Sequence, residues 1–324
     1  MDFKLNINHD GDIRILQITD MQIIDANQRR FPDRIKGWSV TAWVPENNDK
    51  NLYSHIRYLK DKTNPDLIII TGDIIYGEFD DAGTSFVEFC EFMDSLEVPW
   101  APVYGNHDNE SQKGIDWQCE TFANAKYSLF KRGEVFGNSN YTIGIYRNGT
   151  LQRIMYMVDS NGCGKLAISQ GMREDQIQWV KDTAAKYPGV PAFLCYHIPS
   201  GDFQDAYIAQ GYLEKPDPAH NDFVKFEIGV DREAKNGDFG KKREWFVAPS
   251  LRLMPMFKEA NIDGVFAGHY HITNTSVLYE GIRFTMGLKT GLYDYYDREA
   301  IGGTAITLNG KDFKVEHVYY HLED

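Results

Sequence analysis

The chain has 324 residues, of which 42% are hydrophobic and 25% charged, an ordinary composition for a globular protein of one or two domains. Its formal net charge of −13 argues against a nucleic-acid polymer as a partner, because binding along a phosphate backbone needs clustered Lys and Arg side chains. A small anionic substrate would therefore need a local positive centre, which metal ions would supply.

The sequence pattern contains neither a membrane segment nor an export signal. No run of 18 apolar residues occurs, and residues 1–12 are polar without a hydrophobic stretch. We therefore expect no membrane span and a cytoplasmic location; a protein from which a leader had been removed would instead be exported. The 4 cysteines show no C-x-x-C spacing, so no disulfide framework is predicted. Nothing in the sequence indicates an oligomeric state.

The first half of the chain alternates strands with helices. Apolar runs predict strands at residues 13–19, 67–71 and 100–104, and apolar residues at helical spacing predict helices at 51–62 and 86–96. This β-α-β-α-β order favours parallel strands joined by right-handed crossovers.

The middle of the chain begins with a hairpin. Asn148-Gly149, between strands predicted at residues 141–145 and 152–158, is typical of an antiparallel hairpin turn. Near the C-terminus, alternating apolar residues and glycine turns predict antiparallel strands. These lie at residues 275–279, 282–286, 303–308 and 314–320.

Two more helices precede strands that end in histidine. The helix predicted at residues 172–186 leads to a strand ending at His197, and the helix at 250–260 leads to one ending at His269. The simplest arrangement is an α/β fold with two sheets and helices on the outer faces. One sheet is expected to be mixed and to start parallel, the other to be mainly antiparallel.

Two long segments, residues 23–51 and 200–248, lack periodicity. Loops of this length are usually functional, and both follow strand ends that carry polar residues, so we expect both to border the pocket; plain surface insertion is the alternative. Their aromatic residues would form an apolar wall for a nucleotide or another aromatic leaving group, or would simply pack within the loops. They are Trp38, Trp43, Phe203, Tyr207 and Tyr212.

Polar side chains close five of the apolar runs. Beyond the carboxyl ends of strands in open α/β sheets lies the crevice where ligands bind. A lone Asp there is usually a turn residue, and a lone His is usually structural, but the set is harder to explain in that way. His269 and His271, two positions apart, would face the same side of an extended chain. The full set is Asp20, Asp73, Asn106, His107, His197, His269 and His271.

Carboxylate, amide and imidazole groups without thiolates suit Mn, Fe or Zn, and not a cysteine-type structural zinc site. Six or more ligands exceed what one tetrahedral ion uses. A two-metal centre, with ions roughly 3.5–4 Å apart and a bridging carboxylate, accommodates them. Such a centre clamps the attacking and leaving oxygens of phosphoryl transfer and lowers the pKa of a bridging water. The predicted reaction is therefore hydrolysis of a phosphate ester.

The order of these motifs resembles that of the calcineurin-like metallophosphoesterases, over about residues 13–286. The resemblance implies a four-layer αββα sandwich of two mixed sheets with a dinuclear site, which we expect to form one domain over residues 1–324. The matching motifs are Asp20-x-Gln22, Gly72-Asp73, Gly105-Asn106-His107-Asp108, His197 and Gly268-His269-x-His271.

The resemblance also implies a role for each side chain. Asp73 bridges the ions, and His107 is a non-ligand that stabilises the transferring phosphoryl group or protonates the leaving oxygen. The remaining ligands are Asp20 and His271 for the first ion, and Asn106, His197 and His269 for the second.

One motif departs from the family pattern. The pattern begins D-x-H, whereas Gln22 stands where the His ligand is expected. The purple acid phosphatase branch also lacks this His and uses a Tyr in G-D-x-x-Y, and Tyr76 stands at that spacing after Gly72-Asp73. Tyr76 is thus a candidate substitute ligand, with strand-edge packing as the alternative, and Gln22 is a candidate weak ligand.

The preferred interpretation is a phosphomonoesterase that acts on a small phosphorylated substrate. Two alternatives stay open: a cyclic-nucleotide or phospholipid diesterase on the same scaffold, and a metal- or phosphate-binding protein whose activity is weakened through Gln22.

Overall fold

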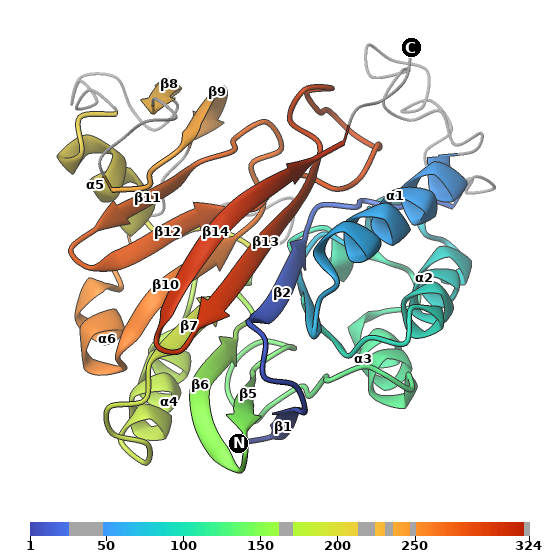
Figure 1. Cartoon of the computed structure of the whole chain (residues 1–324). Coiled ribbons are helices and arrows are strands. Elements are labelled where there is room, and N and C mark those ends of the chain that lie inside the picture. The colour runs from blue at the N-terminus through green and yellow to red at the C-terminus, as the bar shows by residue number, and fades with distance from the viewer. Residues whose placement is uncertain (26–47, 162–170, 213–223, 231–235, 247–250, 321–324) are drawn as a thin grey trace.

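The computed structural model describes residues 1–25, 48–161, 171–212, 224–230, 236–246 and 251–320. These residues form two large β-sheets with helices on their outer sides (Figure 1). Within them, no helix is both long and apolar enough to cross a membrane.

The smaller sheet has 5 strands and contains the first β-α-β-α-β unit. The three strands that begin at Ile13, Leu67 and Trp100 are parallel, as predicted, and are connected by helices α1 (Asn48–Thr63) and α2 (Thr84–Ser95). Strand β3 is buried along its whole length, which is the pattern of a parallel strand covered on both faces. In spatial order the strands are β14 (Asp312–Tyr319), β13 (Gly302–Asn309), β2 (Ile13–Ile18), β3 (Leu67–Thr71) and β4 (Trp100–Val103).

The larger sheet has 7 strands and contains both histidine-ending strands, β7 and β10, side by side and parallel. In spatial order the strands are β1 (Phe3–Ile7), β5 (Tyr141–Arg147), β6 (Thr150–Met157), β7 (Ala192–Cys195), β10 (Ile262–Ala267), β12 (Ile282–Met286) and β11 (Ser276–Tyr279). A separate antiparallel hairpin consists of β8 (Val224–Val230) and β9 (Gly240–Phe246).

The helices divide between the two sheets (Figure 1). Helices α1, α2 and α3 (Ile115–Asn124) lie on the side of the five-stranded sheet, whereas α4 (Glu174–Ala184), α5 (Asp202–Ala209) and α6 (Met254–Glu259) lie on the side of the seven-stranded sheet. Between the sheets, Phe193 of β7 meets Phe313 of β14 edge to face, with ring centroids 4.7 Å apart. The expected four-layer αββα sandwich is confirmed.

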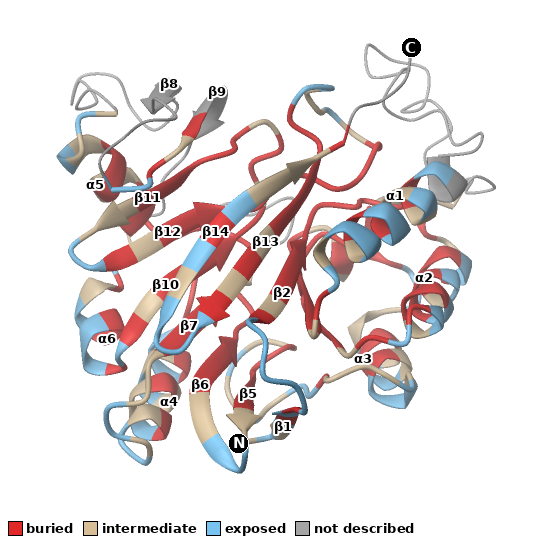
Figure 2. Ribbon diagram, viewed as in Figure 1, coloured by how far each residue is buried: buried red, intermediate tan, exposed pale blue. Residues whose placement is uncertain are grey.

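Burial follows this layering (Figure 2). One core lies between the sheets and under α1–α3, and a second lies between the seven-stranded sheet and α4–α6. Because both faces of the central strands are covered, their carboxyl ends are held rigidly where the polar motifs begin.

The sequence prediction of a second, mainly antiparallel sheet was wrong, because the seven-stranded sheet is mixed, with four parallel and two antiparallel strand pairs. The two C-terminal hairpins join different sheets: β12 pairs parallel with β10, and β13 pairs antiparallel with β2. Alternating apolar residues predict a hairpin but do not say which sheet edge the hairpin joins.

Several elements were not predicted. They are β1, α3, α5 and the β8–β9 hairpin, and the last two lie inside the segment 200–248 that was expected to be irregular. Of the other long segment, residues 26–47 lie outside the described part of the chain, together with Trp38 and Trp43.

Candidate metal centre

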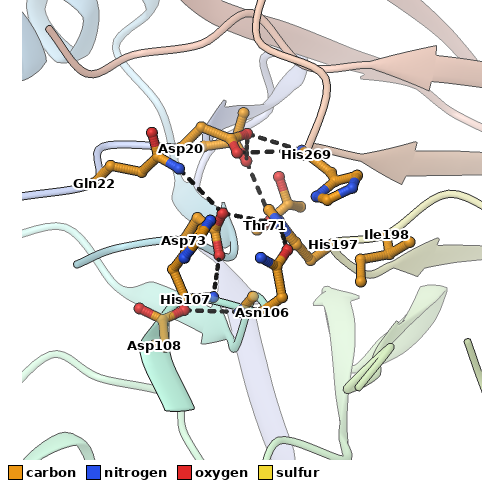
Figure 3. A network of polar contacts seen from close by, with 12 residues as sticks. Asp20, Gln22, Thr71, Asp73, Asn106, His107, Asp108, His197, Ile198 and His269 are labelled. Atoms are coloured by element: carbon orange, nitrogen blue, oxygen red, sulfur yellow. Dashed lines mark hydrogen bonds and ion pairs between the residues drawn. The ribbon is translucent and has the colours of Figure 1, made fainter. Parts of the chain in front are cut away.

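The ends of five strands, three from one sheet and two from the other, bring the predicted side chains together (Figure 3). Asp20 and Asp73, after β2 and β3, are each 1% exposed, and His197, after β7, is fully buried. Asn106 after β4 and His271 after β10 are also buried. A buried set of carboxylate, amide and imidazole groups is costly unless the groups are paired or hold a cation.

Two groups of side chains have ligand atoms close enough to hold an ion. In each group the atoms lie within 4.8 Å of one another, and Asp73 belongs to both. A carboxylate shared by two neighbouring ligand sets is the arrangement that a dinuclear centre needs. The residues therefore fit a pair of metal ions. The groups are Asp73, His197 and His269, and Asp20, Asp73 and His271.

The backbone is strained at this site. Asp20, Gln22, Asp73 and His269 have φ values of 54°, 49°, 50° and 77°, in the left-handed region that side chains other than glycine rarely adopt. Such strain persists only where the surrounding structure imposes it, and it gathers at functional sites. Here it turns each side chain away from its strand and toward the others.

Two glycines of the motifs are required by close approach. A Cβ at Gly105 would lie 2.1 Å from Asp73 Oδ1, and one at Gly268 would lie 2.2 Å from Thr19 Oγ1. A larger residue at Gly105 would push apart the turns after β3 and β4, and one at Gly268 would push apart the ends of β10 and β2.

His197 is held by one ring nitrogen and faces the site with the other. Its Nδ1 lies 2.8 Å from the carbonyl oxygen of Thr71, which can only accept a hydrogen bond. Its Nε2 therefore faces Asp73 Oδ2 at 3.3 Å and Asn106 Oδ1 at 3.2 Å. Burial opposes charge on this ring, but the carboxylates of Asp73 and Asp20 raise the pKa of His197 to about 9. A cation at Nε2 would take the place of this proton.

His271 repeats the arrangement at Asp20. Its Nδ1 lies 3.1 Å from the carbonyl oxygen of Tyr295, and its Nε2 lies 3.3 Å from Asp20 Oδ1. His269 donates its main-chain N–H to the Asp20 carboxylate. Burial, with help from the neighbouring His197, lowers the pKa of His269 to about 3, so this ring is neutral and can act as a ligand. In His197 and His271, the hydrogen bond at Nδ1 fixes the ring, so that Nε2 points in a fixed direction.

His107 lies beside the two groups and belongs to neither. Its main-chain N–H donates to Asp73 Oδ1 at 2.9 Å, and its Nδ1 lies 2.8 Å from Glu110 Oε2. Burial works against protonation, but the carboxylates of Asp73 and Glu110 outweigh it and raise the pKa of His107. Glu110 was missed in the sequence, although its spacing of three residues from His107 is the signal that would have revealed it.

Asp108 connects two of the strand ends. Its carboxylate accepts the main-chain N–H groups of Ile74, Ile75 and Gly105, at 2.9, 3.0 and 2.7 Å. Burial, reinforced by the negative charge of Asp73, raises the pKa of Asp108 to about 7. These bonds hold the turn after β3 against the turn after β4, and so set the distance between Asp73 and His107.

Comparison with known proteins agrees with this geometry. The family model for calcineurin-like phosphoesterases matches residues 13–273. The chain belongs to this family. The family works with dinuclear metal centres, and the two ligand groups around Asp73 are the candidate centre in this member.

Individual relatives share less of the sequence. The chain is 23% identical to "Phosphatase DCR2" of Saccharomyces cerevisiae over 282 aligned positions, covering 83% of this chain and 45% of the yeast protein. It is 24% identical to "Probable inactive purple acid phosphatase 28" of Arabidopsis thaliana over 324 aligned positions, covering 90% of this chain and 73% of that protein. The expected resemblance to the purple-acid-phosphatase-like branch is confirmed by this relative.

A solved structure supports the fold. The crystal structure of a dimetal phosphatase from Danio rerio superposes with a TM-score of 0.56 at 11% identity, covering 95% of this chain and 96% of the other. At this identity the likeness concerns the fold alone.

Gln22, where the family pattern has a histidine, is bonded on both sides. Its Nε2 donates to Asp73 Oδ2 at 3.3 Å, and its Oε1 accepts from the ammonium group of Lys289 at 2.8 Å. Lys289 follows β12, is 1% exposed and was not predicted as a site residue. Its sequence surroundings carry no motif, so the missing histidine was the only hint that a further residue contacts Gln22.

Tyr76 lies at the site, and its ring stacks on His107 with ring centroids 3.9 Å apart. Its role as a metal ligand stays a prediction.

The prediction of an aromatic wall at the pocket was wrong for two of its residues. Phe203 and Tyr207 are fully buried in the core beside the seven-stranded sheet. Their spacing is that of the buried face of helix α5, which explains why they point inward.

Proposed function

We propose that this protein is a dimetal phosphomonoesterase that hydrolyses a small phosphorylated substrate. The observation that carries the proposal is the carboxylate of Asp73, shared by two Asp/His groups whose ligand atoms lie within 4.8 Å of one another. The family membership and the name of the yeast relative support the same class of reaction. We propose Fe, Mn or Zn as the ions, because the donors are oxygen and imidazole nitrogen without thiolates.

The geometry supports the following ligand roles. Asp73 would bridge, Asp20 and His271 would serve one ion, and His197 and His269 would serve the other, with the Asn106 amide oxygen beside His197. Bound ions supply a water of lowered pKa and neutralise the charge of the phosphoryl oxygens. The remaining chemistry belongs to the side chains of this chain.

His107 is the acid of the proposed reaction. Nδ1 of His107 is hydrogen-bonded to Glu110, so Nε2 of His107 is the nitrogen that can carry a proton toward the substrate. The raised pKa of His107 favours the protonated ring. A protonated imidazole attracts the negative phosphoryl oxygens and can deliver a proton to the leaving alkoxide. The stacked ring of Tyr76 restricts the orientation of His107.

A substrate panel tests the proposal. Metal-free protein is reconstituted with Mn²⁺, Zn²⁺ or Fe, and hydrolysis of 4-nitrophenyl phosphate is compared with that of bis(4-nitrophenyl) phosphate. The monoester is expected to turn over faster, and the Asp73→Asn variant, purified in parallel, controls for contaminating phosphatases. A strong preference for the diester would contradict the proposal and identify the protein as a phosphodiesterase.

Metal analysis tests the remaining alternative. A protein weakened through Gln22 would hold fewer than one ion per chain after reconstitution, or would hold its ions without turning over either ester. The cytoplasmic location and the single domain over residues 1–324 remain predictions from the sequence.

A further inference from the structure

We infer that Lys289 and Gln22 make the two metal positions of this centre unequal, so that one divalent ion binds tightly and the other weakly. The inference rests on the proposed function, since it concerns the ions which that function requires. We call Asp20, Asp73 and His271 the first position, and Asp73, Asn106, His197 and His269 the second position. Lys289 stands beside the first position and weakens it.

Lys289 is fixed beside the site by hydrogen bonds of both its side chain and its backbone. Its ammonium group donates to the main-chain carbonyl oxygen of Asp20 at 2.9 Å as well as to Gln22 Oε1. Its own carbonyl oxygen accepts the N–H of Gly302 at 3.0 Å, which ties the segment after β12 to β13. A lysine that is only 1% exposed is rare unless its charge is paired.

These contacts allow only one orientation of the Gln22 amide. An ammonium group can only donate hydrogen bonds, so the atom facing Lys289 must be the amide oxygen. A carboxylate can only accept, so the atom facing Asp73 must be the amide nitrogen. Both ends of the side chain require the same orientation, and the opposite one would place donor against donor and acceptor against acceptor.

Gln22 therefore cannot replace the histidine ligand of the family pattern. The only atom of its amide that binds metal ions, the oxygen, is occupied by Lys289, and its N–H points at the bridging carboxylate. Apart from Tyr76, whose ligand role is a separate prediction, the first position has three side chains that offer ligand atoms, and the second has four. Because Gln22 offers no ligand atom, the first position is expected to be the weaker.

Charge acts in the same direction. Lys289 adds a fixed positive charge next to Gln22 and Asp20, in an interior where charges are poorly screened. Repulsion from this ammonium group opposes a cation that enters the first position. The second position is therefore expected to fill before the first.

The test is a titration of metal-free protein with Mn²⁺, followed by calorimetry and by electron paramagnetic resonance. Wild type is expected to bind one ion per chain tightly and a second at least about tenfold more weakly, a difference of about 1.4 kcal/mol. The first equivalent should give the signal of an isolated Mn²⁺, and the signal of a coupled pair should appear only after it.

Two variants should narrow this gap. Lys289→Met keeps most of the buried stem but removes the charge, and the weaker site is expected to gain at least about tenfold in affinity. Gln22→Glu keeps Lys289 paired and so remains informative if Lys289→Met fails to fold; it should strengthen the same site. Lys186→Met, at an exposed lysine after α4, is the matched control for the loss of one positive charge and should change nothing.

The outcomes separate the inference from the proposed function. Two ions bound with equal affinity by wild type, or a gap that survives Lys289→Met and Gln22→Glu, would overturn the inference while leaving the phosphoesterase intact. Failure of wild type and of every variant to bind Mn²⁺ would overturn both. Unequal binding without hydrolysis of either nitrophenyl ester would leave the inference standing and remove the enzyme.

Discussion

His107 and Glu110 form an ion pair within one turn of the chain, with Nδ1 and Oε2 2.8 Å apart. The main-chain N–H of the same histidine donates to Asp73. His107 is thus held by two carboxylates, and only one of them belongs to the candidate metal ligands. When ions neutralise Asp73, Glu110 remains as the anion that is hydrogen-bonded to the ring, and it favours the protonated form together with the more weakly acting Asp294.

Replacing Glu110 by Gln should move the alkaline limb of the rate profile to lower pH. Glu110 raises the pKa of His107, so its neutral analogue lowers that pKa. A group that must be protonated is lost as the pH rises through its pKa, and the variant should therefore lose activity at a lower pH than wild type. The measurement is kcat against pH, with the exposed Glu134→Gln as the matched control. An unmoved limb would remove His107 from the role of acid.

Asp73→Asn should nearly abolish hydrolysis and reduce metal content. A neutral amide cannot hold two cations across one bridge as a carboxylate does, and Asp73 is the one side chain common to both ligand groups. Turnover and bound metal are measured together after reconstitution. Asp61→Asn, at an exposed site on α1, serves as the control. Activity within a few-fold of wild type would exclude Asp73 as the bridge.

His107→Ala should behave differently from Asp73→Asn. The side chain is outside both ligand groups, and the main-chain N–H that contacts Asp73 survives the substitution. Metal content should stay normal while kcat falls by on the order of 10²–10⁴-fold, the range for a positioned acid–base group. His9→Ala, at an exposed histidine, is the control. Loss of metal from the His107 variant would place this ring among the ligands.

The strands that carry the site, and the polar motifs that follow them, were predicted well because both depend on the local pattern of apolar and polar residues. A run such as residues 67–71 is apolar at nearly every position, as a doubly covered parallel strand must be, and a polar motif follows directly. Parallel strands bring such motifs to one edge of a sheet. The two sheets also bring such edges together, so that Asp73 after β3 and His197 after β7, 124 residues apart in sequence and on different sheets, meet at 3.3 Å.

The parts that were not predicted depend on tertiary contacts. Lys289 becomes part of the site only because the segment after β12 packs against the strained turn at Asp20, a contact that spans 269 residues and leaves no motif in either partner. Phe203 and Tyr207 were misplaced for the converse reason. Their helical spacing was hidden by the polar residues around them, so a core contact was interpreted as a pocket wall.

Tyr76 offers two separable features, a ring and a hydroxyl. The ring lies at 23° to the plane of His107 and restricts that imidazole, so Tyr76→Leu should lower kcat several-fold with metal content unchanged. Tyr76→Phe retains the ring and tests whether the Tyr76 hydroxyl is a metal ligand.

If the Tyr76 phenolate binds iron, the Fe(III)-loaded wild type is coloured by a charge-transfer band, and Tyr76→Phe bleaches this colour while the protein stays folded. A colourless iron-loaded wild type, together with a Tyr76→Phe variant of full metal content and rate, would leave the contact with His107 as the role of Tyr76. Wild-type kinetics in Tyr76→Leu would contradict that role as well.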